Sequence, residues 1–249
     1  MEVSKIYPIA YDKKHFVVMS NDIIKGKQEM SLQQARIIRL LITQVVKQDK
    51  DLKTYRCRIK DLADFLGIDS SNLYRDIKQF CSDLLDLKVK VGTSNPKEPW
   101  AIFQWLQLAK YDGNGNITLM LSNQIAPFVL ELDKYFTQYQ QANILSMQSY
   151  YAIRLYELLK MQHGINQYTS NFNFSIDELR IYFCCENKYK AFKDFRVRVI
   201  EIAVNEINSK TDLLVTPTYL KTGRTITNID FEVHYQSIKQ LDGQIDFGG

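Results

Sequence analysis

The chain has 249 residues, is 45% hydrophobic and 24% charged, and carries a formal net charge of +4. This composition is that of a folded globular protein, and no apolar run approaches the ~18 residues of a membrane span. The first residues lack the apolar core of a signal peptide, so we expect a cytoplasmic protein without membrane contact. The length fits one large domain or two of ordinary size, and the weak positive charge favours an anionic partner.

The chain shows no pattern typical of a metal site or of an enzyme. Its four cysteines have no CxxC spacing and its three histidines are scattered, so we interpret the cysteines as buried thiols. A phosphate-binding GxxxxGK[ST] loop, a GxSxG motif and an HExxH motif are all absent from the sequence. We therefore expect no catalytic residues, no metal, no cofactor and no enzymatic activity.

The first half of the chain predicts three helices. The first begins after Ser31, a good N-cap, and carries apolar residues at helical spacing as far as Val45. A short helix over about 59–66 follows, and Gly67 suits the left-handed position past its end. A third, amphipathic helix over about 71–86 comes next. Two short helices joined by a tight turn, the second amphipathic, are typical of a helix-turn-helix.

Strand-like segments follow these helices. They cover residues 87–91, 101–109 and 117–121, and a turn with the sequence DGNG over 112–115 joins the last two. Glycine-containing turns between such segments predict β-hairpins. Because a helix-turn-helix followed by a hairpin is a winged helix, this half predicts a winged-helix domain.

The segments of the first half recur in the second half. SLQQARIIRLL (31–41) matches SMQSYYAIRLY (146–156) at Ser, Gln, Ile, Arg and Leu, with a shift of 115 positions. NLYRDIKQF (72–80) returns with the same shift as NKYKAFKDF (187–195). RIKDLADFLGI also resembles SIDELRIYF, with a shift of 117. Three matches in one order at nearly one shift indicate an internal duplication.

The second half therefore predicts a second winged helix. Its first helix runs from Ser146 to about Met161, and its hairpin consists of residues 213–220 and 227–235 around a Lys-Thr-Gly-Arg turn. The predicted fold class is α+β, with two tandem winged-helix domains. We expect an N-terminal arm (1–15), a first winged-helix domain (16–137), a second (138–236) and a C-terminal tail (237–249).

The two copies differ in charge at the helix that would enter DNA. Residues 187–198 contain five basic residues and one acid, a local charge of +4, whereas residues 72–86 contain two basic residues and three acids, a local charge of −1. A basic helix fits the major groove, where lysine and arginine reach guanine N7 and O6 or the phosphates. We expect the second copy to make the main contact with double-stranded DNA. The alternative is a charged face that is only solvated, and it stays open above all for the first copy.

Ten polar residues are the candidate DNA-binding residues. In the second copy they are Lys188, Lys190, Lys193, Arg196 and Arg198 on the predicted helix and Lys221 and Arg224 on the wing. In the first copy they are Arg75, Lys78 and Gln79 on the outward face of the helix.

Several segments, in this order and spacing, carry a family resemblance over about residues 16–236. They are VVMSNDII, SLQQARIIRLL, RIKDLADFLGI, FTQYQ, IRLYELLK, YKAFKDFRVRVI and INSKTDLLV. The chain resembles the initiator replication proteins of theta-replicating, iteron-containing plasmids.

The resemblance implies a function and a set of partners. The implied protein binds direct repeats at a plasmid origin as a monomer, with the C-terminal winged helix in the major groove. As a homodimer, formed mostly by the N-terminal domain, it represses its own gene at an inverted repeat. It also melts an adjacent AT-rich segment and recruits the host replication initiator and helicase.

Two other functions are alternatives. A dedicated winged-helix transcriptional repressor would bind a palindromic operator and leave plasmid replication unaffected by its loss. A nicking enzyme of rolling-circle replication would use Tyr150, Tyr151 or Tyr156 as its nucleophile. The missing HxH pair argues against the nicking enzyme.

Overall fold

The chain folds as two units, Met1–Gln141 and Ala142–Gly249, in a computed structural model that describes residues 5–92, 97–165 and 170–236. The expected domain boundary after residue 137 falls within β9 (Phe136–Gln140), which pairs antiparallel with β2 (Phe16–Ser20) of the first unit. None of the described helices is long and apolar enough to cross a membrane.

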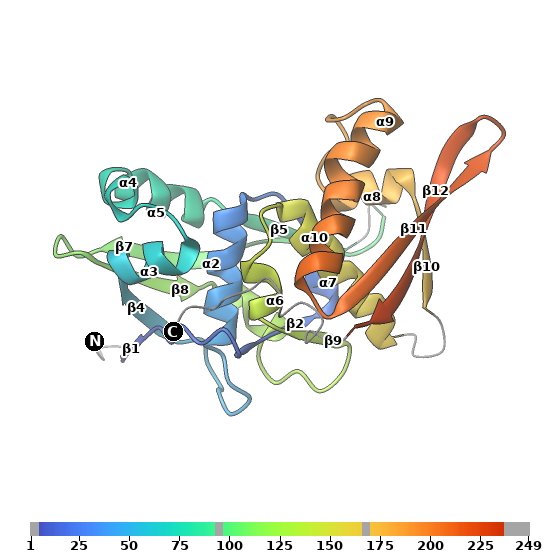
Figure 1. Cartoon of the computed structure of the whole chain (residues 1–249). Coiled ribbons are helices and arrows are strands. Elements are labelled where there is room, and N and C mark those ends of the chain that lie inside the picture. The colour runs from blue at the N-terminus through green and yellow to red at the C-terminus, as the bar shows by residue number, and fades with distance from the viewer. Residues whose placement is uncertain (1–4, 93–96, 166–169, 237–249) are drawn as a thin grey trace. The chain divides into compact units, whose positions relative to one another are not determined.

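The second unit is a winged helix with one three-stranded antiparallel sheet in the order β10-β12-β11 (Figure 1). Its elements are α6 (Ala142–Leu145), α7 (Tyr150–Ile165), β10 (Asn171–Ser175), α8 (Ile176–Tyr182), α9 (Phe192–Phe195), η2 (Arg196–Glu201), α10 (Ile202–Lys210), β11 (Leu213–Thr222) and β12 (Thr225–Tyr235). Strands β11 and β12 form a long hairpin, the wing, and the first residues of β11 pack against α10.

The first unit repeats this order of elements and adds to it. Its elements are β1 (Ile6–Pro8), β2, α1 (Asn21–Lys25), β3 (Lys27–Gln28), α2 (Leu32–Thr43), β4 (Thr54–Arg58), α3 (Ile59–Leu66), α4 (Ser70–Arg75), α5 (Ile77–Leu85), β5 (Lys88–Gly92), β6 (Trp100–Gln104), β7 (Leu106–Tyr111), β8 (Asn116–Leu121), η1 (Asn123–Phe128) and β9. The sheet β1-β4-β8-β7 contains the equivalents of β10, β12 and β11, and a second sheet has the order β3-β5-β6. The α+β prediction of two tandem winged helices is confirmed.

Local signals in the sequence set several helix ends. The Ser31 hydroxyl accepts a hydrogen bond from the Gln34 N–H at 3.3 Å, and the Gln34 side chain accepts one from the Ser31 N–H at 2.7 Å. Ser175 and Glu178 form the same reciprocal capping box at the start of α8. Gly67 takes φ +68° after α3, the left-handed conformation that glycine adopts without a steric penalty. These ends agree with the predicted ones.

The predicted third helix of the first copy is wrong as one helix. It breaks at Asp76, whose φ of −103° and ψ of 14° lie outside the helical region, so that α4 ends at Arg75 and α5 begins at Ile77. Aspartate has a low helix propensity, and the Asp76 side chain forms two hydrogen bonds with the Arg75 guanidinium. Leu73 and Ile77, on either side of the break, are both buried.

The predicted strand over 101–109 is also wrong as one strand. It divides at Trp105, which is fully buried. The Trp105 N–H donates to the Leu87 carbonyl, and the Trp105 carbonyl accepts from the Ser122 N–H, both at 2.9 Å. The residues before Trp105 therefore pair with β5, whereas those after it pair with β8.

The first helix of the second copy starts later than predicted. It begins at Tyr150 rather than at Ser146, because the Gln148 and Ser149 N–H groups both donate to the Glu206 carboxylate, at 2.8 and 3.2 Å. Glu206 belongs to α10, so a side chain distant in sequence caps this helix.

Each unit buries an arginine at the same position of the duplication. Arg39 on α2 lies with its Cζ 5.9 Å from the centroid of the Trp105 ring. Arg154 on α7, 115 residues later, lies 4.0 Å from that of Tyr182. Both side chains are fully buried, and stacking on an aromatic ring suits a guanidinium withdrawn from water.

Candidate nucleic-acid interface

The helix that follows α8 in the second unit runs without a break from Phe192 to Lys210. Its middle third, Arg196–Glu201, is π-helical, a wider turn that often occurs at functional sites. Phe195, Val199 and Ile200 form the buried side of the helix and are fully buried. Its opposite side, here called the outer face, consists of the exposed residues Lys193, Asp194, Val197 and Arg198.

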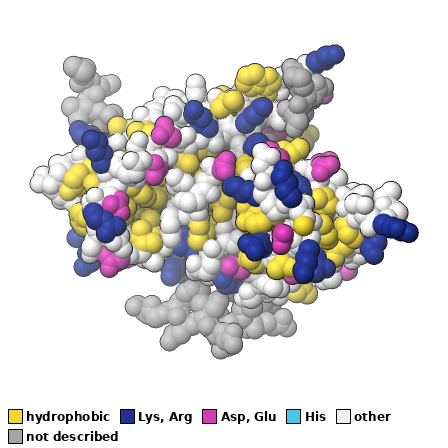
Figure 2. Space-filling model, turned by 90° about the horizontal axis from the view of Figure 1, so that it is seen from above, with side chains coloured by type: hydrophobic (Ala, Val, Ile, Leu, Met, Phe, Trp, Pro, Cys, Tyr) yellow, Lys and Arg dark blue, Asp and Glu magenta, His cyan; other side chains and the backbone are white. Residues whose placement is uncertain are grey.

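Two of the candidate cations stand on this outer face. Lys193 and Arg198 are exposed, and neither forms a hydrogen bond or an ion pair within the part of the chain that the structure describes. Figure 2 looks onto the side of the molecule where α9 lies in Figure 1 and shows dark blue lysine and arginine side chains standing out from the surface, with yellow apolar ones between them. Unpaired cations of this kind can bind phosphate or base edges without first losing an internal partner.

Arg196 takes a different direction. Its Nε lies 3.2 Å from Glu201 Oε1, and its Cζ lies 5.9 Å from the centroid of the Tyr219 ring on β11. The Nε–H finds no hydrogen-bond acceptor of good geometry, so the contact with Glu201 is an ion pair only. Arg196 therefore links the helix to the wing, and only part of its side chain is exposed.

Lys188 and Lys190 lie outside the helix. The prediction placed them on it, but the helix begins at Phe192, and residues 186–191 form a loop in which Tyr189 has a φ of +52°. In the first copy, the corresponding Asn72, Leu73 and Tyr74 belong to α4. The two stretches with matching sequence thus differ in structure up to the residue where α5 and α9 begin.

Arg180 on α8 shapes this loop, and sequence reasoning missed it. Its guanidinium donates hydrogen bonds to the carbonyls of Lys188 at 3.0 Å, Tyr189 at 2.8 Å and Lys190 at 3.3 Å. Its Cζ also lies 4.6 Å from the centroid of the Phe195 ring, so one side chain connects the loop to the helix. The repeat carries no signal for this role, because the equivalent position of the first copy is Ala63.

The wing presents the two remaining cations of the second copy. Lys221 and Arg224 are exposed, and neither has a hydrogen-bond or ion-pair partner among the described residues. The turn consists of Gly223, at φ +62°, and Arg224, so that Lys221 lies within β11 and not in the turn.

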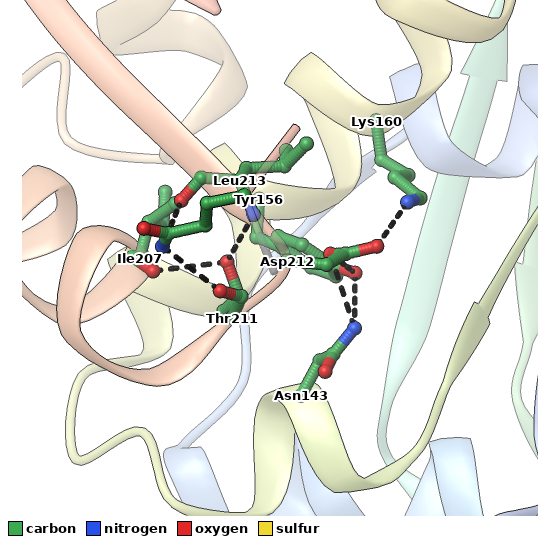
Figure 3. A network of polar contacts seen from close by, with 8 residues as sticks. Asn143, Tyr156, Lys160, Ile207, Thr211, Asp212 and Leu213 are labelled. Carbon is green, nitrogen blue, oxygen red and sulfur yellow. Dashed lines mark hydrogen bonds and ion pairs between the residues drawn. The ribbon is translucent and has the colours of Figure 1, made fainter. Parts of the chain in front are cut away.

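A polar network holds the base of the wing. The Asp212 carboxylate, directly before β11, accepts hydrogen bonds from Lys160 Nζ at 2.5 Å, Tyr156 Oη at 2.8 Å and Asn143 Nδ2 at 3.2 Å (Figure 3). Burial raises the pKa of Tyr156 well above its ordinary value. Because Tyr156 is buried and bonded to a carboxylate, it is not placed to act as the nucleophile of a nicking reaction.

The first unit pairs its candidate residues internally. The Arg75 guanidinium forms two hydrogen bonds with the Asp76 carboxylate, at 3.0 and 2.8 Å, and they hold the pKa of Asp76 below its usual range. Gln79 Nε2 donates to Asp83 Oδ1 at 2.7 Å. Lys78 is exposed and, within the described residues, has no such partner. Among the candidate residues that the structure describes, the first unit thus has one unpaired cation, Lys78, whereas the second unit has four, Lys193, Arg198, Lys221 and Arg224.

The four cysteines are all buried and reduced, as predicted for buried thiols. Burial raises the pKa of Cys57 and of Cys185 to about 11 in each case, which disfavours the reactive thiolate. Within residues 5–92, 97–165 and 170–236, no group of three or more His, Cys, Asp or Glu side chains could hold a metal ion.

The duplicated fold and its unpaired surface cations define a tandem winged-helix protein of the DNA-binding class. The family described as "Initiator Replication protein, WH1" matches residues 16–160, and "Initiator Rep protein, WH2" matches residues 175–233. The chain belongs to this family of initiator replication proteins, as its sequence resemblance predicts. Members are DNA-binding initiators of replication and not enzymes.

Individual relatives agree with this assignment. A "Replication initiation protein" of Escherichia coli is 24% identical over 235 residues, which cover 92% of this chain and 71% of the relative. The "PI protein" of Escherichia coli is 25% identical over 213 residues, with 72% and 69% covered. The crystal structure of a Pi initiator protein in complex with iteron DNA has a TM-score of 0.71 and 22% identity, and the match covers 90% of this chain and 99% of that one. This structure supports the fold.

Proposed function

We propose that the protein initiates plasmid replication by binding direct repeats, or iterons, at the plasmid origin as a monomer. The observation that carries the proposal is the outer face of the helix Phe192–Lys210, where Lys193 and Arg198 are exposed and unpaired in a winged helix of an initiator family. The similar Pi initiator is known in complex with iteron DNA, which supports this choice of ligand.

The second unit makes the principal contact in this proposal. An α-helix fits the major groove, where Lys193 and Arg198 reach guanine N7 and O6 or the flanking phosphates. Lys221 and Arg224 reach a phosphate backbone from the wing, and Lys188 and Lys190 do so from the loop that Arg180 holds. Arg196 contacts DNA if it leaves Glu201. The first unit adds a weaker contact through Arg75, Lys78 and Gln79.

We further propose the partners that the family resemblance implies. The protein acts in the cytoplasm, forms a homodimer mainly through the first unit, and as a dimer represses its own gene at an inverted repeat. The host replication initiator and helicase join the complex at the opened origin.

Binding of the purified chain to duplexes with the direct repeats beside its gene tests the proposal. We expect a clear preference over random duplex of the same length, and a log affinity that falls with log salt by about 0.9 per phosphate neutralised. No preference between the two duplexes would reject the proposal. A plasmid that replicates without this gene, although its promoter is repressed by the protein, would instead favour a dedicated repressor.

A further inference from the structure

Val197 is an apolar side chain in the middle of an otherwise charged surface. It lies on the outer face between Lys193, one turn before it, and Arg198, and 41% of it is exposed. Single exposed apolar residues are common on proteins and need no special explanation. This one, however, occupies the surface that the proposed function places against base edges, and valine is a poorer helix former than the polar residues usual on a solvated helix.

Val197 lies on the side of the helix opposite its buried residues. Within the π-helical segment Arg196–Glu201, Val199 and Ile200 are both fully buried, and Arg196 turns sideways toward Glu201 and Tyr219. Of the six residues of this segment, Val197 and Arg198 are the exposed ones, and Glu201 is half-buried. The segment therefore brings one apolar and one cationic side chain to the outer face together.

A cationic side chain and an apolar side chain recognise different groups on the bases. Lysine and arginine only donate hydrogen bonds, so Lys193 and Arg198 suit the acceptors of guanine. The 5-methyl group of thymine is the apolar group that a base pair presents in the major groove, and an apolar side chain recognises it by contact. Neither cation on the outer face can make that contact.

We propose that Val197 is a specificity-determining residue that contacts the 5-methyl group of a thymine in the bound DNA, next to the positions read by Lys193 and Arg198. The proposal rests on the proposed function, because it requires the outer face to enter the major groove. It adds one base identity that the cations alone cannot supply.

Deoxyuridine lacks only the thymine methyl group, so it tests the contact directly. The full chain first selects its own site from a duplex library randomised over about two helical turns, roughly 21 base pairs. Each thymine of the selected site is then replaced singly by deoxyuridine, and the affinity is measured for the unsubstituted protein and for Val197→Ala. Ile202→Ala is the matched control, since Ile202 is a β-branched residue of the same helix and is 42% exposed.

We expect one thymine whose replacement weakens binding of the unsubstituted protein about fourfold, the equivalent of ~0.8 kcal/mol for one buried methyl-sized group. Val197→Ala should show no penalty at that thymine, and Ile202→Ala should retain it. Alanine favours the helix, so the variant is expected to fold. The proposal is overturned if no thymine shows the penalty, or if Val197→Ala keeps it. An unsubstituted protein that selects no sequence would overturn the proposed function and this contact together.

Discussion

Replacing Asp212 by alanine should destabilise the second unit by removing the centre of the network at the base of the wing. The carboxylate accepts hydrogen bonds from Lys160, Tyr156 and Asn143, and the side chains of Lys160 and Asp212 are 11% and 22% exposed. Breaking a fully buried ion pair costs about 3–5 kcal/mol, whereas an exposed one contributes about 0–1 kcal/mol. The Lys160–Asp212 pair is partly buried, and its removal also leaves the Tyr156 hydroxyl and the Asn143 amide without one acceptor. We therefore expect the free energy of unfolding to fall by about 2–3 kcal/mol.

Urea unfolding and amide hydrogen exchange together measure this loss in the correct unit. Both tryptophans, Trp100 and Trp105, lie in the first unit, so their fluorescence follows that unit alone, and exchange resolved by peptide follows α7, α10 and β11. Asp230→Ala is the control, because Asp230 lies on β12 and makes no side-chain hydrogen bond or ion pair among the described residues, and it should change stability by less than about 0.5 kcal/mol. An Asp212→Ala variant as stable as this control would show that the Asp212 network does not stabilise the second unit.

Three further substitutions test separate parts of the structure. Arg180→Lys keeps the charge but loses the planar fork that reaches three carbonyls, so we expect about tenfold weaker DNA binding with an unchanged salt slope; a reduced slope would mean that Arg180 contacts phosphate itself. Gly67→Ala should cost about 1 kcal/mol in urea unfolding, because an added Cβ meets no atom within 4 Å and only the left-handed backbone is strained. The Asn116 amide and nearby backbone N–H groups hold the pKa of Asp112 below its usual range. The ionised Asp112 carboxylate therefore stabilises the folded protein above the ordinary carboxyl pKa of about 4, and this contribution to the free energy of unfolding is lost as the pH falls below it. Asp112→Asn should therefore lose less stability between pH 7 and pH 3 than the unsubstituted protein, and an equal loss would contradict this assignment.

Local signals made much of the fold predictable from the sequence. The duplication, the Ser31 cap, the Gly67 terminus and the two wing hairpins each depend on residues close together in the chain, and all of them are present. The charge contrast between the two copies also pointed to the helix on which Lys193 and Arg198 are exposed and, among the described residues, unpaired.

The features that sequence could not show depend on contacts between distant residues. Trp105 divides a strand because its carbonyl and N–H face different sheets, and Glu206 caps a helix from another helix. Helical periodicity assumes a regular α-helix, so it missed both the loop at Lys188 and Lys190 and the π-helical segment. The Arg180 contacts have no counterpart in the first copy, so the repeat gave no indication of them.

A comparison of Lys193→Ala with Lys78→Ala in binding to the origin repeats shows which winged helix makes the main contact with DNA. The two lysines are equivalent in the duplication, each is exposed, and each is the second residue of its helical segment, α9 or α5. We expect Lys193→Ala to weaken specific binding by about 1–3 kcal/mol, roughly tenfold or more, and Lys78→Ala to weaken it less than about threefold. Equal losses for the two variants would contradict the claim that the second winged helix makes the main contact with DNA.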